Sequence, residues 1–395
     1  MKIKKSRLNI YFMFLSVFFY ALFDVMNSAS SGNNNGNRGI VYLFLFIIIG
    51  CMIKKFIFQR YKKINKLELS MCTFTIYLVL HSIITDTLLE WNQFILIILS
   101  VWWFFTINYW RNVICDKEIV LLVNKFIKFI YIFYSIAMVY SSINIVSNFS
   151  TNYARVGYIY HILALFPFVL LMKNNKEKNT YIILTYILSF ISLKRGAIII
   201  LPVTHLCYIF FQKEYSTKKI LKIILSFALL FSAFLIFNNM TNGYLKSRFT
   251  IQEISDGSGR GETNKDAIEN LKKRNIIQLF FGIQNENETI LETGIHNEVL
   301  SEIYAYGIIG LLIYINIYAN IIMLGFRLAK KDHSIKSSYY SMFIYLILLG
   351  TVSGVYFVHS TFYIMMYIGY ICAIVKLKRR NEQNENRNYN ISICG

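Results

Sequence analysis

Arg260 and Arg195 are the side chains of this sequence best suited to holding a phosphate group. Arg260 stands between two glycines in a Ser-Gly-Arg-Gly segment, where the backbone and the guanidinium group can approach a ligand closely. Arg195 follows Lys194 in a short turn between two apolar segments. A guanidinium group stays charged and presents a planar fork that matches phosphate oxygens, so both arginines suit a diphosphate group. The alternative is that they are ordinary solvated arginines.

His296 and Arg155 complete the set of candidate residues. His296 ends a long polar segment, directly before Asn297 and Glu298. An imidazole group titrates near neutrality, so it could accept a proton from a sugar hydroxyl group, or it could simply hydrogen-bond a neighbour. Arg155 lies in a Tyr-Ala-Arg-Val-Gly segment, where it could add to the same positive charge or be a surface arginine whose stem lies along apolar groups.

The composition indicates what kind of molecule must position these residues. Hydrophobic residues make up 56% of the 395 residues and charged residues only 16%, which is more apolar surface than a soluble domain could bury. The sequence therefore predicts an all-α polytopic membrane protein. The net charge of +20 does not indicate nucleic-acid binding, because the basic residues lie in short clusters between apolar runs.

Twelve apolar segments could cross a membrane as helices, for which about 20 residues each are needed. Most of the 41 Lys and Arg residues fall in alternate connections, and the positive-inside rule then predicts a multi-pass protein of the cytoplasmic (inner) membrane with both termini in the cytoplasm. The predicted spans are residues 9–26, 39–53, 69–85, 93–110, 126–146, 158–172, 179–192, 196–211, 220–239, 303–326, 338–357 and 360–375.

One connection is much longer than the others, and we expect it to carry chemistry, since long ordered loops are usually lids or binding elements. It lies outside the cytoplasm and includes a predicted amphipathic helix from Thr263 to Arg274, with Ala267, Ile268 and Leu271 on its apolar face. The chain is therefore divided into residues 1–239 with nine spans, the loop 240–297, residues 298–376 with three spans, and a polar cytoplasmic tail 377–395.

Polar residues inside the predicted spans have simpler interpretations. His81, His161 and His205 are expected to be packed or hydrogen-bonded in the bundle, and Asp24, near a helix end, to be hydrated. The six cysteines fall in helices or on the cytoplasmic side, so no extracytoplasmic disulfide framework is expected. Zinc-site spacings and an Asp-x-Asp motif are absent from the sequence, and we expect neither a metal ion nor a cofactor.

The order of these elements resembles the O-antigen polymerase and O-antigen ligase superfamily (Wzy-type). The resemblance rests on motifs between Leu193 and Gly310. The turn lacks the usual Ser before Arg-Gly and reads Leu-Lys-Arg-Gly, and the frequent Phe-Gly-x-Gly ends in Gln284. The motifs that carry the resemblance are Ser192-x-x-Arg195-Gly196, Ser258-Gly259-Arg260, Phe281-Gly282-Ile283, His296-Asn297-x-x-Leu300 and Gly307-Ile308-Ile309-Gly310.

Members of that superfamily are membrane glycosyltransferases that use sugars linked to undecaprenyl diphosphate. The resemblance implies that Arg195 and Arg260 hold the diphosphate and that His296 acts as a base or positions the acceptor. It implies polymerisation of a surface polysaccharide, either O-antigen, capsule or exopolysaccharide, with membrane lipid, a flippase and a chain-length regulator as partners. Two alternatives stay open: a ligase that moves a finished polymer, and a flippase or other transporter of lipid-linked oligosaccharides.

Overall fold

The computed structural model describes residues 5–29, 38–58, 64–88, 90–148, 158–192, 194–212, 217–240, 243, 246, 250, 260–284, 295, 297–330, 333–352 and 360–393. All regular secondary structure in these residues is helical, as predicted. The helices are α1 (Lys5–Ala29), α2 (Arg38–Ile57), α3 (Lys66–Ile84), α4 (Trp91–Val113), α5 (Lys117–Asn148), α6 (Ile159–Leu170), α7 (Asn175–Ile191), α8 (Arg195–Phe211), α9 (Thr217–Met240), α12 (Arg260–Lys273), α13 (Ile276–Phe281), α14 (Glu298–Ala329), α15 (His333–Val352) and α16 (Thr361–Ile393).

Each of the twelve predicted segments coincides with a helix, namely α1 to α9 and α14 to α16. Within the described ranges, seven helices are long and apolar enough to cross a membrane: α1 to α5, α14 and α16. The chain is therefore a membrane protein. That all twelve helices cross the bilayer stays a prediction.

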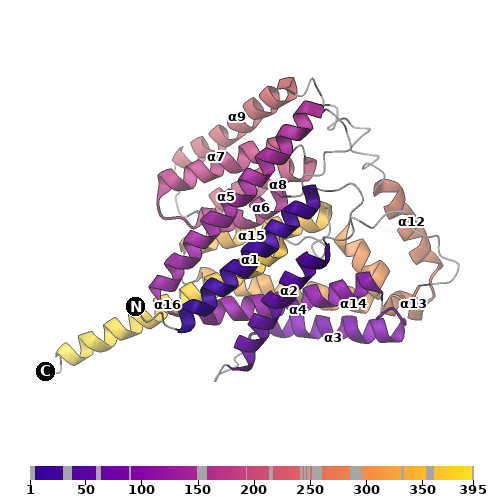
Figure 1. Cartoon of the computed structure of the whole chain (residues 1–395), viewed down its shortest axis with the longest axis horizontal. Coiled ribbons are helices and arrows are strands. Elements are labelled where there is room, and N and C mark those ends of the chain that lie inside the picture. Colours follow the sequence, from indigo (N-terminus) through magenta and orange to yellow (C-terminus); the bar gives the residue numbers. More distant parts are fainter. Residues whose placement is uncertain are drawn as a thin grey trace.

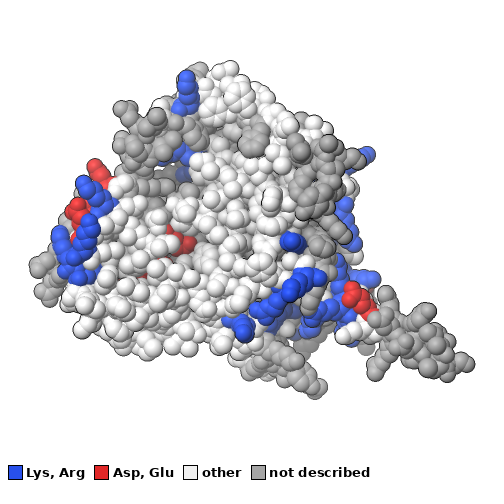
Figure 2. Space-filling view, turned by 180° about the vertical axis from the view of Figure 1, so that it is seen from behind, with Lys and Arg blue, Asp and Glu red and all other residues white. Residues whose placement is uncertain are grey.

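Different helix ends and connecting helices lie at the two ends of the bundle. α1 begins and α16 ends at the left of Figure 1, whereas α12 and α13 lie at the right. On the face seen in Figure 2, most Lys and Arg side chains gather at two ends, and the surface between them is largely uncharged with one small acidic patch. Such a surface suits contact with acyl chains. That α12 and α13 lie at the opposite membrane face from the start of α1 and the end of α16 stays a prediction.

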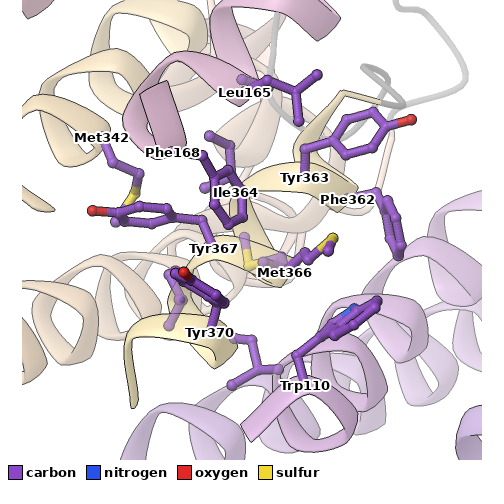
Figure 3. Close-up of a cluster of buried hydrophobic side chains, with 14 of the residues drawn as sticks. Trp110, Leu165, Phe168, Met342, Phe362, Tyr363, Ile364, Met366, Tyr367 and Tyr370 are labelled. Carbon is purple, nitrogen blue, oxygen red and sulfur yellow. The ribbon is translucent and has the colours of Figure 1, made fainter. Parts of the chain in front are cut away.

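α16 forms the centre of the bundle. Its first turns are apolar all round, which is typical of a helix buried on every side, and residues Phe362 to Ile368 are at most 1% exposed. The rings of Tyr363 and Tyr367, one helical turn apart, extend away from each other (Figure 3). Tyr367 shares a hydrogen bond of 2.6 Å with Ser338 of α15. The helix also continues to Ile393, where the polar composition had predicted an irregular tail.

Candidate functional site

The turn before α8 holds two of the predicted site residues. Lys194 is the residue before the helix and Arg195 is its first residue, and both side chains are half-buried. The Lys194 N–H donates to Ser192 Oγ at 3.1 Å, which fixes the turn. The first turn of α8 contains no acidic residue, so two cations add to the positive end of the helix dipole. This arrangement favours an anion at the start of α8.

Helix α12 runs from Arg260 to Lys273, so it begins three residues before the predicted start at Thr263, and it packs against α14. The side chain of Arg260 lies outside the described residues. The predicted apolar face of α12 is partly wrong: Ala267 is buried, but Ile268 is 45% exposed. The residues that face the bundle are instead Thr263, Ala267, Asn270 and Arg274, spaced as one helical stripe.

Polar side chains face the bundle because α14 offers them hydrogen-bond partners. Arg274 Nη1 donates to the carbonyl oxygen of Tyr304 at 2.7 Å, and its guanidinium carbon lies 4.5 Å from the centre of the Tyr304 ring. Asn270 Nδ2 donates to the Tyr304 hydroxyl group at 3.4 Å. These contacts fix helix α12 on α14.

Replacing Arg274 with leucine is expected to release α12 from α14. The variant keeps the apolar stem but leaves the Tyr304 carbonyl group without this donor, and a hydrogen bond to a charged group contributes about 1.5–3 kcal/mol. Limited proteolysis of the purified protein should then cut the loop faster than in the wild type. Lys273→Leu, a change at an exposed neighbouring residue, is the control. Equal cleavage of the two variants would contradict the anchoring role.

α14 is bent sharply at Gly307, whose backbone is not helical (φ 69°, ψ −172°). The Glu298 carboxylate accepts hydrogen bonds from Tyr314 and, at 3.1 Å, from Tyr318. In a straight helix these residues would be about 24 and 30 Å apart along the axis. Residues 298–306 (the short arm) therefore fold back on residues 308–329 (the long arm).

The bend is stabilised by donors from outside α14. A helix that stops leaves its last carbonyl groups without partners, and here these are the carbonyl groups at the end of the short arm. The Tyr77 hydroxyl group of α3 donates to the Tyr306 carbonyl oxygen at 2.6 Å, and Arg274 donates to that of Tyr304. A side chain at Gly310 would approach the Tyr77 ring to 3.0 Å, so this glycine makes room for the donor.

Two motif glycines meet at the bend. Gly282 ends α13 in the left-handed conformation (φ 72°), and a Cβ atom placed there would lie 2.5 Å from the Gly307 nitrogen. A Cβ atom at Gly307 would likewise collide with the backbone of Gly282 and Phe280. Backbone packs on backbone, so both positions require glycine. The Phe-Gly-Ile and Gly-Ile-Ile-Gly motifs are thus the two sides of one contact.

The His-Asn-x-x-Leu motif forms the start of the short arm. Asn297 caps the helix, because its side chain accepts the Leu300 N–H at 3.1 Å. Glu298 follows and is buried, and a Cβ atom at Gly350 of α15 would collide with its carboxylate group. Glu302 is buried one turn later, and its Oε2 accepts no hydrogen bond from the described residues. The motif therefore places two carboxylate groups inside the protein, beginning two residues after His296.

The structure places some of the predicted site residues, and it does not describe the positions of others. Lys194 and Arg195 share the start of α8, and Arg260 opens the helix that packs on α14. Arg155 and His296 lie outside the described residues, so their convergence with the arginines stays a prediction. Sequence reasoning missed Arg274, Glu298 and Glu302 as buried polar residues. The spacing of Glu298 and Glu302, one helical turn apart, was the available signal.

The expected packing of the three histidines is confirmed. His205 Nδ1 lies 3.0 Å from the Tyr186 hydroxyl group, and the His81 ring packs edge-on against Tyr306 with 5.2 Å between ring centres. The His161 ring stacks on Tyr134, and its Nε2 also lies 3.3 Å from Oδ2 of Asp24. The expectation of a hydrated Asp24 was therefore largely wrong: only 15% of its side chain is exposed.

No protein-family model matches the chain, and no curated protein matches its sequence. The superfamily resemblance consequently stays a prediction that rests on the sequence motifs.

Proposed function

We propose that the chain is a glycosyltransferase of the O-antigen polymerase type, with twelve spans and both termini in the cytoplasm. It transfers the growing glycan from undecaprenyl diphosphate to a hydroxyl group of the next lipid-linked repeat unit, at the outer face of the cytoplasmic membrane. The observation that carries the proposal is the contact between Gly282 and Gly307. It joins two motifs of the resemblance, 25 residues apart in the chain, into one element that contains the residues following His296.

The proposed roles follow from the charge of the leaving group. Departure of a polyprenyl diphosphate leaves negative charge on phosphate oxygens, and Arg195 and Arg260 would stabilise that charge in place of a metal ion. Lys194 and Arg155 would add to the positive potential. His296 would activate or orient the acceptor hydroxyl group. The start of α8, with two cations and no acidic residue in its first turn, supports the assignment of Arg195.

The bend in α14 bears on the transporter alternative. Transporters typically pair two interrupted helices near the middle of the membrane. In the described part of the chain, α14 is interrupted at Gly307 and its break faces the loop helix α13, not a second interrupted helix. This arrangement favours an enzyme whose loop is held on the bundle. A ligase would use the same diphosphate grip, and the product of the reaction distinguishes it from a polymerase.

Replacing Arg195, Arg260 or His296 with alanine is expected to abolish long-chain polysaccharide. Loss of one group that stabilises transition-state charge lowers turnover by roughly 100–1000-fold. The measurement is the polysaccharide length distribution in a deletion strain that expresses each variant at the wild-type level. Lys272→Ala, which removes an exposed cation from α12, is the control and should keep long chains. Long chains in the Arg260→Ala strain would refute the proposed role.

A further inference from the structure

Asp24 and His161 form a buried carboxylate–imidazole pair between α1 and α6. His161 Nε2 lies 3.3 Å from Asp24 Oδ2, and the exposed fractions of the two side chains are 8% and 15%. Ionisable groups inside a membrane bundle are costly, so such a pair marks a functional site more often than a structural one. Neither residue belongs to the motifs discussed above.

Aromatic side chains from two further helices enclose the pair. The Tyr134 ring of α5 stacks on the His161 ring with 4.5 Å between centres, and the Tyr363 ring of α16 meets it edge-on at 6.0 Å. The two tyrosine hydroxyl groups lie 3.2 Å apart. The imidazole ring is thereby held in a fixed orientation, and the carboxylate group is the more exposed member of the pair.

The pair is not needed to join α1 to α6. The Tyr158 hydroxyl group, just before α6, already donates to the Val25 carbonyl oxygen of α1 at 2.6 Å. A buried ion pair often stabilises a fold no better than apolar residues of the same volume. A structural role therefore gives little reason for a carboxylate and an imidazole group at these positions.

The pair also lies at the same end of the bundle as Arg195. α6, α7 and α8 pack on one another, and connections of only a few residues join them. The chain reverses direction at each connection, so the first turns of α6 and α8 lie at the same end. His161 is in the first turn of α6 and Arg195 opens α8.

We propose that Asp24 is the base that accepts the proton of the acceptor hydroxyl group, with His161 as its positioning residue. This inference rests on the proposed function. The acceptor oxygen forms a bond to the anomeric carbon of the donor sugar, and the bond from that carbon to the phosphate oxygen breaks. Its electron pair leaves with undecaprenyl diphosphate. The hydroxyl proton moves to the Asp24 carboxylate group and then to water.

The test uses purified full-length protein in lipid nanodiscs and lipid-linked repeat units extracted from the deletion strain. Asp24→Asn should lower kcat for chain extension by about 100–10,000-fold with KM little changed, since general base catalysis contributes that much. Asp24→Glu should recover part of the lost kcat. His161→Gln should lower kcat less than Asp24→Asn does. His205→Gln, a change at another buried histidine that pairs with a tyrosine instead of a carboxylate, is the control and should keep kcat.

A pair exchange separates chemistry from folding. The double variant Asp24→His/His161→Asp keeps a carboxylate–imidazole pair but moves the carboxylate group to α6, so a purely structural pair predicts normal stability and normal kcat. The proposal predicts normal thermal stability and a kcat as low as that of Asp24→Asn. Wild-type kcat in Asp24→Asn or in the double variant would overturn the proposal. Failure of the wild-type protein to extend the repeat units would instead refute the proposed function itself.

Discussion

Replacing Gly307 with alanine is expected to abolish chain extension and to destabilise the protein. The backbone at this position (φ 69°, ψ −172°) is essentially restricted to glycine, and strain of this kind costs about 1–3 kcal/mol. A Cβ atom would also collide with the backbone of Gly282 and Phe280, where no flexible side chain can yield. The short arm of α14 and helix α13 must then separate, which displaces the segment that leads into α14.

The experiment compares Gly307→Ala with Gly282→Ala and Gly50→Ala. An alanine at Gly282 meets the same backbone from the other side, so its effect should match that of Gly307→Ala. Gly50 lies in α2 with no atom within 4 Å of its would-be Cβ atom, so this control should be neutral. Thermal denaturation of the purified variants and polysaccharide length in cells are the measurements. A Gly307→Ala protein with wild-type stability would show that the glycine contact does not hold the bend.

Replacing Glu298 with alanine is expected to open the bend from its other side. The carboxylate group accepts hydrogen bonds from Tyr314 and Tyr318, and its removal leaves two buried hydroxyl groups without this acceptor. The two hydroxyl groups lie 3.1 Å apart, so one can still donate to the other and a single donor loses its acceptor, which should cost about 1–3 kcal/mol of stability. Glu298→Gln retains an acceptor oxygen and should lose less.

Thermal denaturation in detergent measures this difference. Glu262→Ala, at an exposed position in the first turn of α12, is the matched control and should leave the melting temperature unchanged. If Glu298→Ala and Glu262→Ala had the same melting temperature, the hydrogen bonds to the two tyrosines would contribute nothing to the stability of the fold.

The positions of the helices could be predicted from sequence because lipid imposes a simple rule: a spanning segment must be apolar and form its own backbone hydrogen bonds. The rule fails where a polar side chain is buried against a particular partner. An arginine such as Arg274 is usually solvated at a protein surface. Here the bend in α14 provides the carbonyl group to which it donates a hydrogen bond. The bend itself requires contact between Gly282 and Gly307, and this contact cannot be predicted from the residues next to either glycine in the sequence.

The same reason explains which parts of the candidate site could be found. Arg195 and Arg260 stand out through their neighbours in the chain, and both begin helices in the structure. Asp24 and His161 are far apart in sequence and carry no local signal, so their pairing is visible only in the folded structure. Periodicity predicts helices well, but it does not predict which helices are neighbours.

The central position of α16 has a consequence for biosynthesis. A ribosome delivers helices to the membrane in chain order, so α16 emerges after every other helix of the bundle, including α4 and α6, against which it packs. Until that moment the surfaces that will contact Phe362 to Ile368 have no protein partner and must be covered by lipid or by insertion factors. Packing of α16 against α4 and α6 can therefore form only after those two helices have been made.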